Sequence, residues 1–267
     1  MKRRLDQVVY ERKLVQSRSE AESWIKLGKV RVDGKVVTRP GHFVQSQSKI
    51  VFEASERYVS RAGLKLASVA QALGVDFSNA TVLDVGSSTG GFTDYALQHG
   101  AKKVYAVDVG TDQLHPSLRG DKRIELYEKT DIRVVNVAKK SEKNANLQKT
   151  TLLRGEPFEG VVMIYETPDI VVMDVSFISL REILPHVATL CGKNTQIIAM
   201  LKPQFEAGKH QINKGVIKND AVRREILKDF EAWAKRYFVL RDKKDSDVAG
   251  AKGNRERFYL LAPLLVY

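Results

Sequence analysis

Short apolar runs alternate with segments of helical periodicity over most of the chain. The run from Val82 to Val85 is nearly continuous, as is typical of a strand buried on both faces. Segments 61–73 and 221–238 place their apolar residues on one helical face instead. Further strands are predicted at residues 103–108, 124–132, 170–174, 195–202, 238–241 and 257–261. This alternation predicts an α/β fold with a doubly wound, mostly parallel sheet.

The pattern lapses between Val137 and Pro168, where residues 139–149 are almost entirely polar. We interpret residues 137–168 as an insertion on the surface, with an extra strand within the apolar stretch 160–165. An arm that contacts RNA is the functional alternative for this insertion. A second polar segment, 242–256, is predicted to be a loop before the last strand.

The first 55 residues have a different pattern. Leu5, Val8 and Val9 form a short helical face, and Ser17 with Glu20 forms a capping box that opens a second helix. Alternating residues around Asp33-Gly34 predict a tight hairpin, and residues 49–52 a closing strand. The chain therefore divides into a small α+β domain at 1–55, a linker at 56–60 and a larger domain at 61–267.

Composition narrows the class of protein. The 267 residues are 43% hydrophobic and carry a formal net charge of +12. Half of that surplus lies in residues 1–53, with twelve Lys and Arg against six Asp and Glu, which favours a polyanion such as nucleic acid or an anionic membrane.

Several functional classes are disfavoured by what the chain lacks. The single cysteine, Cys191, excludes a disulfide framework, and the scattered histidines give no metal-binding pattern. The basic N-terminus has no apolar core of a signal peptide, and no run reaches the roughly 18 apolar residues of a spanning helix. We therefore expect a cytoplasmic protein with no metal and no integral membrane association, whose oligomeric state stays open.

A glycine-rich turn follows the first strand of the larger domain. The spacing is D-x-G-x-x-x-G-G, which differs from the G-x-G-x-x-G of dinucleotide enzymes and is associated with S-adenosylmethionine. A strand, a glycine turn and a helix together bring backbone amides close to a ligand. An ordinary βα turn without a ligand is the alternative. The predicted cofactor-binding residues here are Asp84, Gly86, Ser87, Ser88, Thr89, Gly90, Gly91 and Phe92.

Charged residues stand at the ends of the following strands. Asp108 comes 24 residues after Asp84 and can accept hydrogen bonds from ribose hydroxyls. Because ligands bind beyond the carboxyl ends of parallel strands, we expect these residues to share one rim of the sheet. The cofactor site is accordingly predicted to include Asp108, Val109, Asp131 and Asp174.

The N-terminal segment resembles the S4 RNA-binding domain. The resemblance rests on Arg4-Leu-Asp6, Ser17-Arg-Ser-Glu-Ala21, the stretch 25–34 and Thr38-Arg-Pro-Gly41. It implies that basic side chains are placed on structured RNA, where they contact phosphates without reading sequence. The alternative is a basic face that only keeps a small domain soluble. The residues implied are Arg4, Arg18, Lys29, Arg31 and Lys35.

The larger domain resembles the ribose 2′-O-methyltransferases of the FtsJ/RrmJ type. Lys65, Asp174, Lys202 and Glu256 occur in the order of that family's catalytic set. The whole chain is similar to the TlyA family, also called hemolysin A, through segments 58–65, 174–180, 201–205, 214–217 and 253–256. The resemblance implies methylation of ribosomal RNA on the 2′-oxygen of cytidine, with S-adenosylmethionine as donor and ribosomal RNA or ribosomal subunits as partner.

The chemistry suits these residue types. A ribose hydroxyl is a poor nucleophile, so an enzyme must position it and help to remove one proton. Lys202 is the candidate nearest the hydroxyl, with its pKa lowered by Lys65 and the shift opposed by Asp174 and Glu256. Lys202 as neutral base and Lys202 as a charged stabiliser of the alkoxide both stay open. Taken singly, each residue has a structural alternative, as a helix cap, a strand end or a surface charge.

Two other functions remain as alternatives. The hemolysin name suggests a membrane-active cytolysin, although the sequence contains no long basic amphipathic helix. A catalytically inactive RNA-binding factor of ribosome assembly is the second, because the insertion at 137–168 could obstruct the approach of a substrate.

Overall fold

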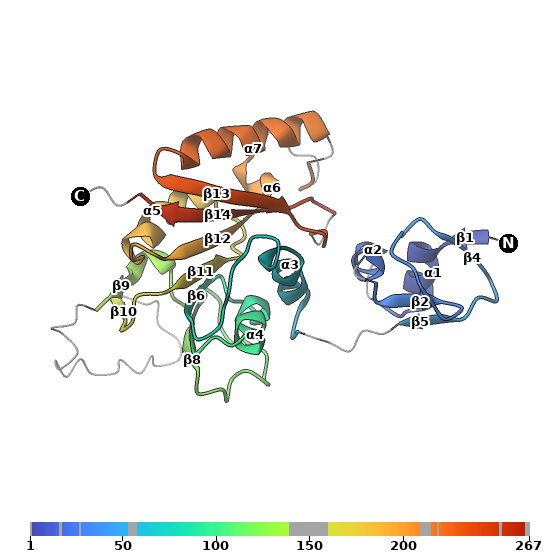
Figure 1. The fold of residues 1–267 in the computed structure, drawn as a ribbon, viewed down its shortest axis with the longest axis horizontal. Coiled ribbons are helices and arrows are strands. Elements are labelled where there is room, and N and C mark those ends of the chain that lie inside the picture. Colours follow the sequence, from blue (N-terminus) through green and yellow to red (C-terminus); the bar gives the residue numbers. More distant parts are fainter. Residues whose placement is uncertain are drawn as a thin grey trace.

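The N-terminal unit combines two helices with two small sheets (Figure 1). The computed structural model describes residues 2–15, 18–26, 28–52, 58–138, 160–208, 215–217, 219–250 and 253–264. A three-stranded antiparallel sheet has the order β3-β2-β5, and a two-stranded ribbon pairs β1 with β4. The elements are β1 (Lys2–Arg4), α1 (Leu5–Glu11), α2 (Arg18–Lys26), β2 (Val30–Val32), β3 (Lys35–Val36), β4 (Phe43–Gln45) and β5 (Ile50–Phe52).

The predicted helices, hairpin and closing strand are confirmed in this unit. Leu5, Val9 and Ile25 are fully buried between the helices and the sheet. The ribbon of β1 and β4 was not predicted, because each strand has only three residues and Lys2–Arg4 has no apolar alternation. The capping residue Ser17 lies outside the described residues, as does part of the predicted linker.

A seven-stranded sheet forms the centre of the larger unit, in the order β13-β14-β12-β11-β6-β7-β8. The run from β12 to β8 is parallel, and β14 and β13 join antiparallel as a hairpin at the edge. The predicted doubly wound, mostly parallel α/β sheet is therefore confirmed. The strands are β6 (Thr81–Val85), β7 (Lys103–Val107), β8 (Ile124–Tyr127), β11 (Ile170–Met173), β12 (Gln196–Leu201), β13 (Phe238–Asp245) and β14 (Arg257–Pro263).

Helices cover both faces of this sheet (Figure 1). Within β6, Val82 packs with α3 and α4, whereas Leu83 and Val85 pack with α5 and α7. The two-residue period of a strand therefore places Asp84 on the face of α3 and α4. The helices are α3 (Arg61–Ala70), α4 (Gly91–Gln98), α5 (Leu180–Thr189), α6 (Pro203–Glu206) and α7 (Asp220–Ala234), with a 3-10 turn η1 (Ile132–Val134).

Several boundaries differ from the sequence predictions, and those around β13 differ most visibly. The last helix ends at Ala234 and not at residue 238, because Phe238 is buried as the first residue of β13. That strand continues to Asp245, past a register shift between Leu240 and Asp242, so the predicted loop begins later than residue 242. Lysines on the outer half of β13 suit an edge strand, where charge discourages further pairing.

The predicted insertion begins and ends in a second small sheet. Strand β10 (Val162–Ile164) pairs in parallel with β9 (Val135–Val137), which confirms the extra strand predicted within 160–165. Residues 139–159 lie outside the described residues. The hypothesis of an RNA-contacting arm concerns this part of the chain. Among the residues described, no helix has the length and apolar character needed to cross a membrane.

Candidate active site

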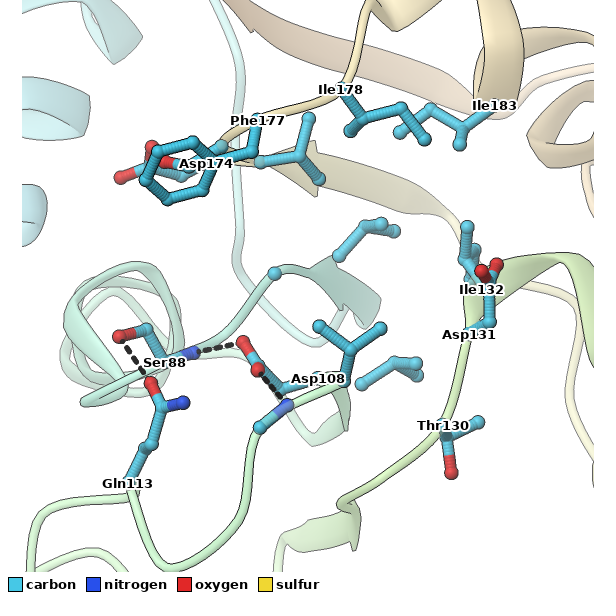
Figure 2. A pocket seen from close by; sticks show the side chains of 17 residues that line it. Ser88, Asp108, Gln113, Thr130, Asp131, Ile132, Asp174, Phe177, Ile178 and Ile183 are labelled. Carbon is cyan, nitrogen blue, oxygen red and sulfur yellow. Dashed lines mark hydrogen bonds between the residues drawn. The ribbon is translucent and has the colours of Figure 1, made fainter. Parts of the chain in front are cut away.

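A cavity of about 450 Å³ opens at the carboxyl ends of β6, β7 and β11 (Figure 2). Polar groups from the glycine turn and the β7 strand end line one side. Apolar side chains, including Val109, Ile132, Ile178 and Ile183, line much of the remainder. A cavity with apolar walls and a few fixed polar groups is the usual form of a small-molecule site.

The Asp108 side chain is held in a fixed position directly after the carboxyl end of β7. One carboxylate oxygen accepts a hydrogen bond from the Ser88 amide at 2.8 Å, and the other accepts one from the Gly110 amide at 2.6 Å (Figure 2). The Ser88 hydroxyl in turn donates to Gln113 at 3.0 Å. A carboxylate has about four acceptor positions, so Asp108 can still accept from a ligand's hydroxyl groups.

The glycine turn requires its glycines for two different reasons. Gly86 and Gly90 have φ values of +79° and +90°, which side chains other than glycine rarely adopt. At Gly91, a Cβ would collide with the Ser60 hydroxyl and would lie 2.8 Å from the Gly63 amide nitrogen. The close approach of the start of α3 to the start of α4 therefore depends on Gly91.

The predicted cofactor residues divide into two groups. Those on the cavity wall are Gly86, Ser88, Asp108, Val109, Asp131 and Asp174. Those that do not line the cavity are Asp84, Ser87, Thr89, Gly90, Gly91 and Phe92. In the second group, Phe92 is buried against Phe258 with ring centroids 6.1 Å apart, so its side chain serves the core.

Asp84 is fully buried beneath the turn. Its Oδ2 accepts a 2.6 Å hydrogen bond from the Thr93 hydroxyl, while Oδ1 has no hydrogen-bond partner among the residues that the structure describes. Burial raises the pKa of Asp84 to about 7, because the hydrogen bonds from Thr93 offset only part of the cost of removing the charge from water. Asp84 therefore lies beside the site as a buried carboxyl and does not line the cavity.

Asp131 reaches the wall with its carboxylate already engaged. The side chain caps η1 by accepting from the Arg133 amide, and the Arg133 guanidinium donates to both oxygens at 3.0 and 2.6 Å. These hydrogen bonds lower the pKa of Asp131, which keeps it ionised. Its contribution to a ligand would come from the oxygen positions that Arg133 leaves open.

Sequence reasoning did not assign the segment that follows β11 to the cavity. Residues 175–178 all line it, and Phe177 at its rim is 91% exposed with a φ of +67°. The centroid of the Phe177 ring lies 5.3 Å from that of Phe205, within α6. The sequence did contain a signal for this segment. The largely apolar residues Val-Ser-Phe-Ile follow an acid that ends a strand, so they lie beyond the sheet and cannot be buried within it.

The structure brings Lys202 and Asp174 together. The Lys202 ammonium lies 2.6 Å from Asp174 Oδ1 and donates to the Ser176 hydroxyl at 2.7 Å. Both charged side chains are mostly buried, at 11% and 16% exposure. Ser176 was not among the predicted site residues. It gives Lys202 a second fixed partner, so the amine is oriented and not only neutralised.

A second ion pair joins the other two predicted catalytic residues. The Lys65 ammonium, from α3, lies 2.6 Å from Glu256 Oε2, just before β14. Burial raises the pKa of Glu256; Lys65 and Lys202 oppose this shift, and the charge of Asp174 adds to it. The Glu256 carboxyl therefore senses both members of the first pair, which indicates that the four side chains form one electrostatic group.

Two of the predicted RNA-binding residues, Arg4 and Arg18, are paired with a buried acid. Asp6 Oδ2 accepts from the Arg4 guanidinium at 2.8 Å and from Arg18 at 2.9 and 3.0 Å. Burial alone would raise the pKa of Asp6, but these hydrogen bonds outweigh it and lower the pKa to about 2. Arg4 and Arg18 remain 44% and 48% exposed, so two oriented guanidinium groups face solvent.

The three remaining predicted RNA-binding residues lie on or next to the hairpin. Lys35 is exposed on β3, while Lys29, just before β2, and Arg31, within it, are partly buried. Arg31 also donates to the Gly34 carbonyl at 3.3 Å, which ties its side chain to the hairpin turn.

The fold and the cavity are those of an S-adenosylmethionine-dependent methyltransferase, and residues 58–262 match the FtsJ-like methyltransferase family. Residues 3–50 match the S4 domain. With this combination, the chain belongs to the TlyA family of S4-containing methyltransferases.

Several relatives cover most of the chain. Hemolysin A of Brachyspira hyodysenteriae is 36% identical over 95% of this chain and 97% of its own length. The 23S rRNA (cytidine-2′-O)-methyltransferase TlyA of Campylobacter jejuni is 40% identical over 77% of this chain and 71% of its own. A solved structure named as a hemolysin, from Streptococcus thermophilus, superposes with a TM-score of 0.67 at 32% identity, covering 99% of this chain and 89% of that one.

The cavity fits the cofactor of this class. Its apolar walls suit a purine, Asp108 can accept from ribose hydroxyls, and the backbone of the glycine turn borders the same space. Val109, 72% exposed directly after Asp108, is an apolar side chain that a bound adenine would cover.

Replacing Asp108 with alanine should weaken binding of S-adenosylmethionine by about 10-fold or more, because a charged hydrogen-bond acceptor is lost and the turn around Ser88 and Gly110 is released. Isothermal titration calorimetry on the full chain measures this directly. The control is Asp121→Ala, which removes a surface acid paired with Arg123. Equal affinity in the Asp108→Ala variant and the wild type would remove Asp108 from the cofactor site.

Proposed function

We propose that this protein methylates the ribose 2′-oxygen of ribosomal RNA, at cytidine, with S-adenosylmethionine as donor. The observation that carries the proposal is two largely buried ion pairs, Lys202 with Asp174, which lines the cofactor cavity, and Lys65 with Glu256, whose carboxyl is influenced by the charges of both. The names of the Campylobacter jejuni and Mycobacterium tuberculosis relatives support cytidine and ribosomal RNA.

The chemistry asks the protein to manage one proton. S-adenosylmethionine, when bound, supplies an electrophilic methyl group, and the acceptor hydroxyl must lose its proton as it attacks. Lys202 is held by Asp174 and Ser176 at the end of β12, so its amine nitrogen is fixed in place. It can take the proton as a neutral amine or stabilise the developing alkoxide as a cation.

Lys65 and Glu256 complete the electrostatic surroundings. Burial raises the pKa of Glu256, and the nearby positive charges of Lys65 and Lys202 favour its ionised form. A Cβ on Gly250 would lie 2.7 Å from Glu256 Oε1, so the loop before β14 leaves room for the carboxyl in this position. Both residues act as positioning groups for the pair nearer the hydroxyl.

An RNA substrate also agrees with the rim of the cavity. The exposed ring of Phe177 stands one residue from Ser176, the hydrogen-bond partner of Lys202. Exposed aromatic rings stack on nucleobases that have left a helix, and RNA is recognised mostly at such unpaired bases. The left-handed backbone at Phe177 keeps the ring away from the core.

Mapping of 2′-O-methyl groups tests the proposal. Purified protein, S-adenosylmethionine and unmethylated 16S and 23S ribosomal RNA or ribosomal subunits should yield a new 2′-O-methylcytidine, detected by mass spectrometry of nuclease digests. A Lys202→Ala sample should form this product about 10²–10⁴-fold more slowly. Methyl transfer to a base atom, or to no ribosomal RNA despite cofactor binding, would contradict the proposal.

A further inference from the structure

One face of the ribbon formed by β1 and β4 carries aromatic, polar and positively charged side chains together. Antiparallel pairing sets Arg4 opposite Phe43 and Lys2 opposite Gln45, and residues two apart on a strand share a face. Burial agrees, since these four are exposed, while Val44 between them is buried. The outer face of the ribbon therefore places an aromatic ring and an amide among two cations.

The cation beside the ring is fixed in position. The Arg4 guanidinium is held by Asp6 through two hydrogen bonds of 2.8 and 3.0 Å, and Asp6 also holds Arg18. A Cβ on Gly41 would lie 3.4 Å from Arg4 Nη1, so the backbone passes close to this group. Arg4 therefore reaches solvent with little rotational freedom left to lose on binding.

Phe43 is a strongly exposed aromatic side chain. At 61% it is the most exposed large apolar side chain among the described residues of the N-terminal unit, ahead of Tyr10, Val36 and Val51. A single exposed apolar residue is ordinary. An aromatic ring directly across a ladder from an immobilised guanidinium is a more specific arrangement, because the two offer a π-face and a phosphate-binding fork side by side.

We propose that Phe43 is a stacking platform for an unpaired nucleobase of the RNA that the N-terminal unit binds, with Arg4 and Lys2 on the adjoining phosphates. The inference rests on the RNA partner of the proposed function and adds a requirement: the RNA offers an unpaired nucleotide at this face. The two cations on the strand paired with Phe43 favour a polyanion over an apolar protein surface. A duplex keeps its bases stacked inside, so it could use the cations but not the ring.

The test is filter binding of the full chain to transcribed 16S and 23S ribosomal RNA over a series of salt concentrations. The Phe43→Leu variant should bind at least about 5-fold more weakly with an unchanged salt slope, because stacking is lost and no phosphate contact is. Phe43→Trp should restore the affinity. Arg4→Gln should reduce the salt slope by about 1. Tyr10→Leu, which removes another exposed aromatic of this unit, is the matched control and should bind as the wild type does.

A spectroscopic readout reports the stacking itself. In the Phe43→Trp variant, the added indole fluorescence should be quenched when RNA binds, whereas Trp24 and Trp233 of the wild type should respond little. Equal affinity of the Phe43→Leu variant and the wild type, or an unquenched indole, would overturn the inference. If Arg4→Gln still lowers the salt slope in that case, RNA binding stands and only the platform fails. Loss of the proposed methylation is measured separately by nucleoside mapping.

Discussion

Replacing Lys202 with alanine should reduce methyl transfer by about 10²–10⁴-fold while cofactor affinity and RNA affinity stay close to those of the wild type. The reason lies in the position of the amine. It is fixed between Asp174 and Ser176 at the rim of the cofactor cavity, so it can act on the acceptor hydroxyl. Lys202 does not line the cavity and is not part of the S4 unit, so its loss should leave both binding affinities unchanged. Single-turnover assays with tritiated S-adenosylmethionine measure the rate, and calorimetry and filter binding measure the two affinities.

A second substitution at the same position separates the two roles of the amine. Arginine keeps the positive charge but does not release its proton. Substantial activity in Lys202→Arg would identify a charged stabiliser, and activity as low as in Lys202→Ala would agree with a proton acceptor. Lys243→Ala, which breaks a surface pair with Glu231, is the control for general effects of losing a paired lysine. Wild-type turnover in Lys202→Ala would remove Lys202 from the reaction.

The sequence was sufficient to predict which strand ends carry charged residues at one edge of the sheet. Buried parallel strands are almost continuous apolar runs, so a charged residue that ends such a run, as Asp108, Asp174 and Lys202 do, is visible without a structure. Because parallel strands place these ends on one edge, their convergence also follows from the pattern. The membership of Lys65 and Glu256 came from resemblance alone, since neither lies at the end of a parallel strand.

Partners within the site could not be predicted. The sequence led to one cluster around Lys202, and within it the structure pairs each lysine with one carboxylate and adds Ser176. Such pairing depends on side-chain directions that spacing does not contain. The ribbon of β1 and β4 was missed for a related reason, because strands of three residues are specified by their partner and not by their own pattern.

Asp84 illustrates how an acid in a glycine motif can face the core. Its position two residues after Val82 directs it to the face of α3 and α4, where Thr93 is its hydrogen-bond donor. Sequence spacing associates the acid with the cofactor, yet it is the strand period that decides where the side chain points.

Replacing Asp84 with asparagine should stabilise the larger unit above pH 7 and flatten its dependence on pH. The pKa of Asp84 is raised from 3.8 to about 7, so between these values the folded state binds a proton that the unfolded state does not. Stability therefore falls as pH rises from about 4 to about 7, by up to roughly 4 kcal/mol for this one group. Asparagine does not ionise in this range, and its carbonyl can still accept from Thr93. Urea unfolding without cofactor at pH 5 and pH 8 measures the difference.

Two further variants make that measurement specific. In a Trp24→Phe background, Trp233 alone reports the unfolding of the larger unit. Asp76→Asn is the control with the opposite sign, because hydrogen bonds from Ser78 lower the pKa of this exposed acid and its contribution to stability is lost as pH falls. The same pH dependence in Asp84→Asn and the wild type would show that the carboxyl does not titrate as we expect. A role of Asp84 in cofactor binding would appear as a lower affinity for S-adenosylmethionine in the more stable Asp84→Asn variant. In that case the Asp84 carboxyl contributes to binding at the expense of the stability of the fold, because burial disfavours its charged form.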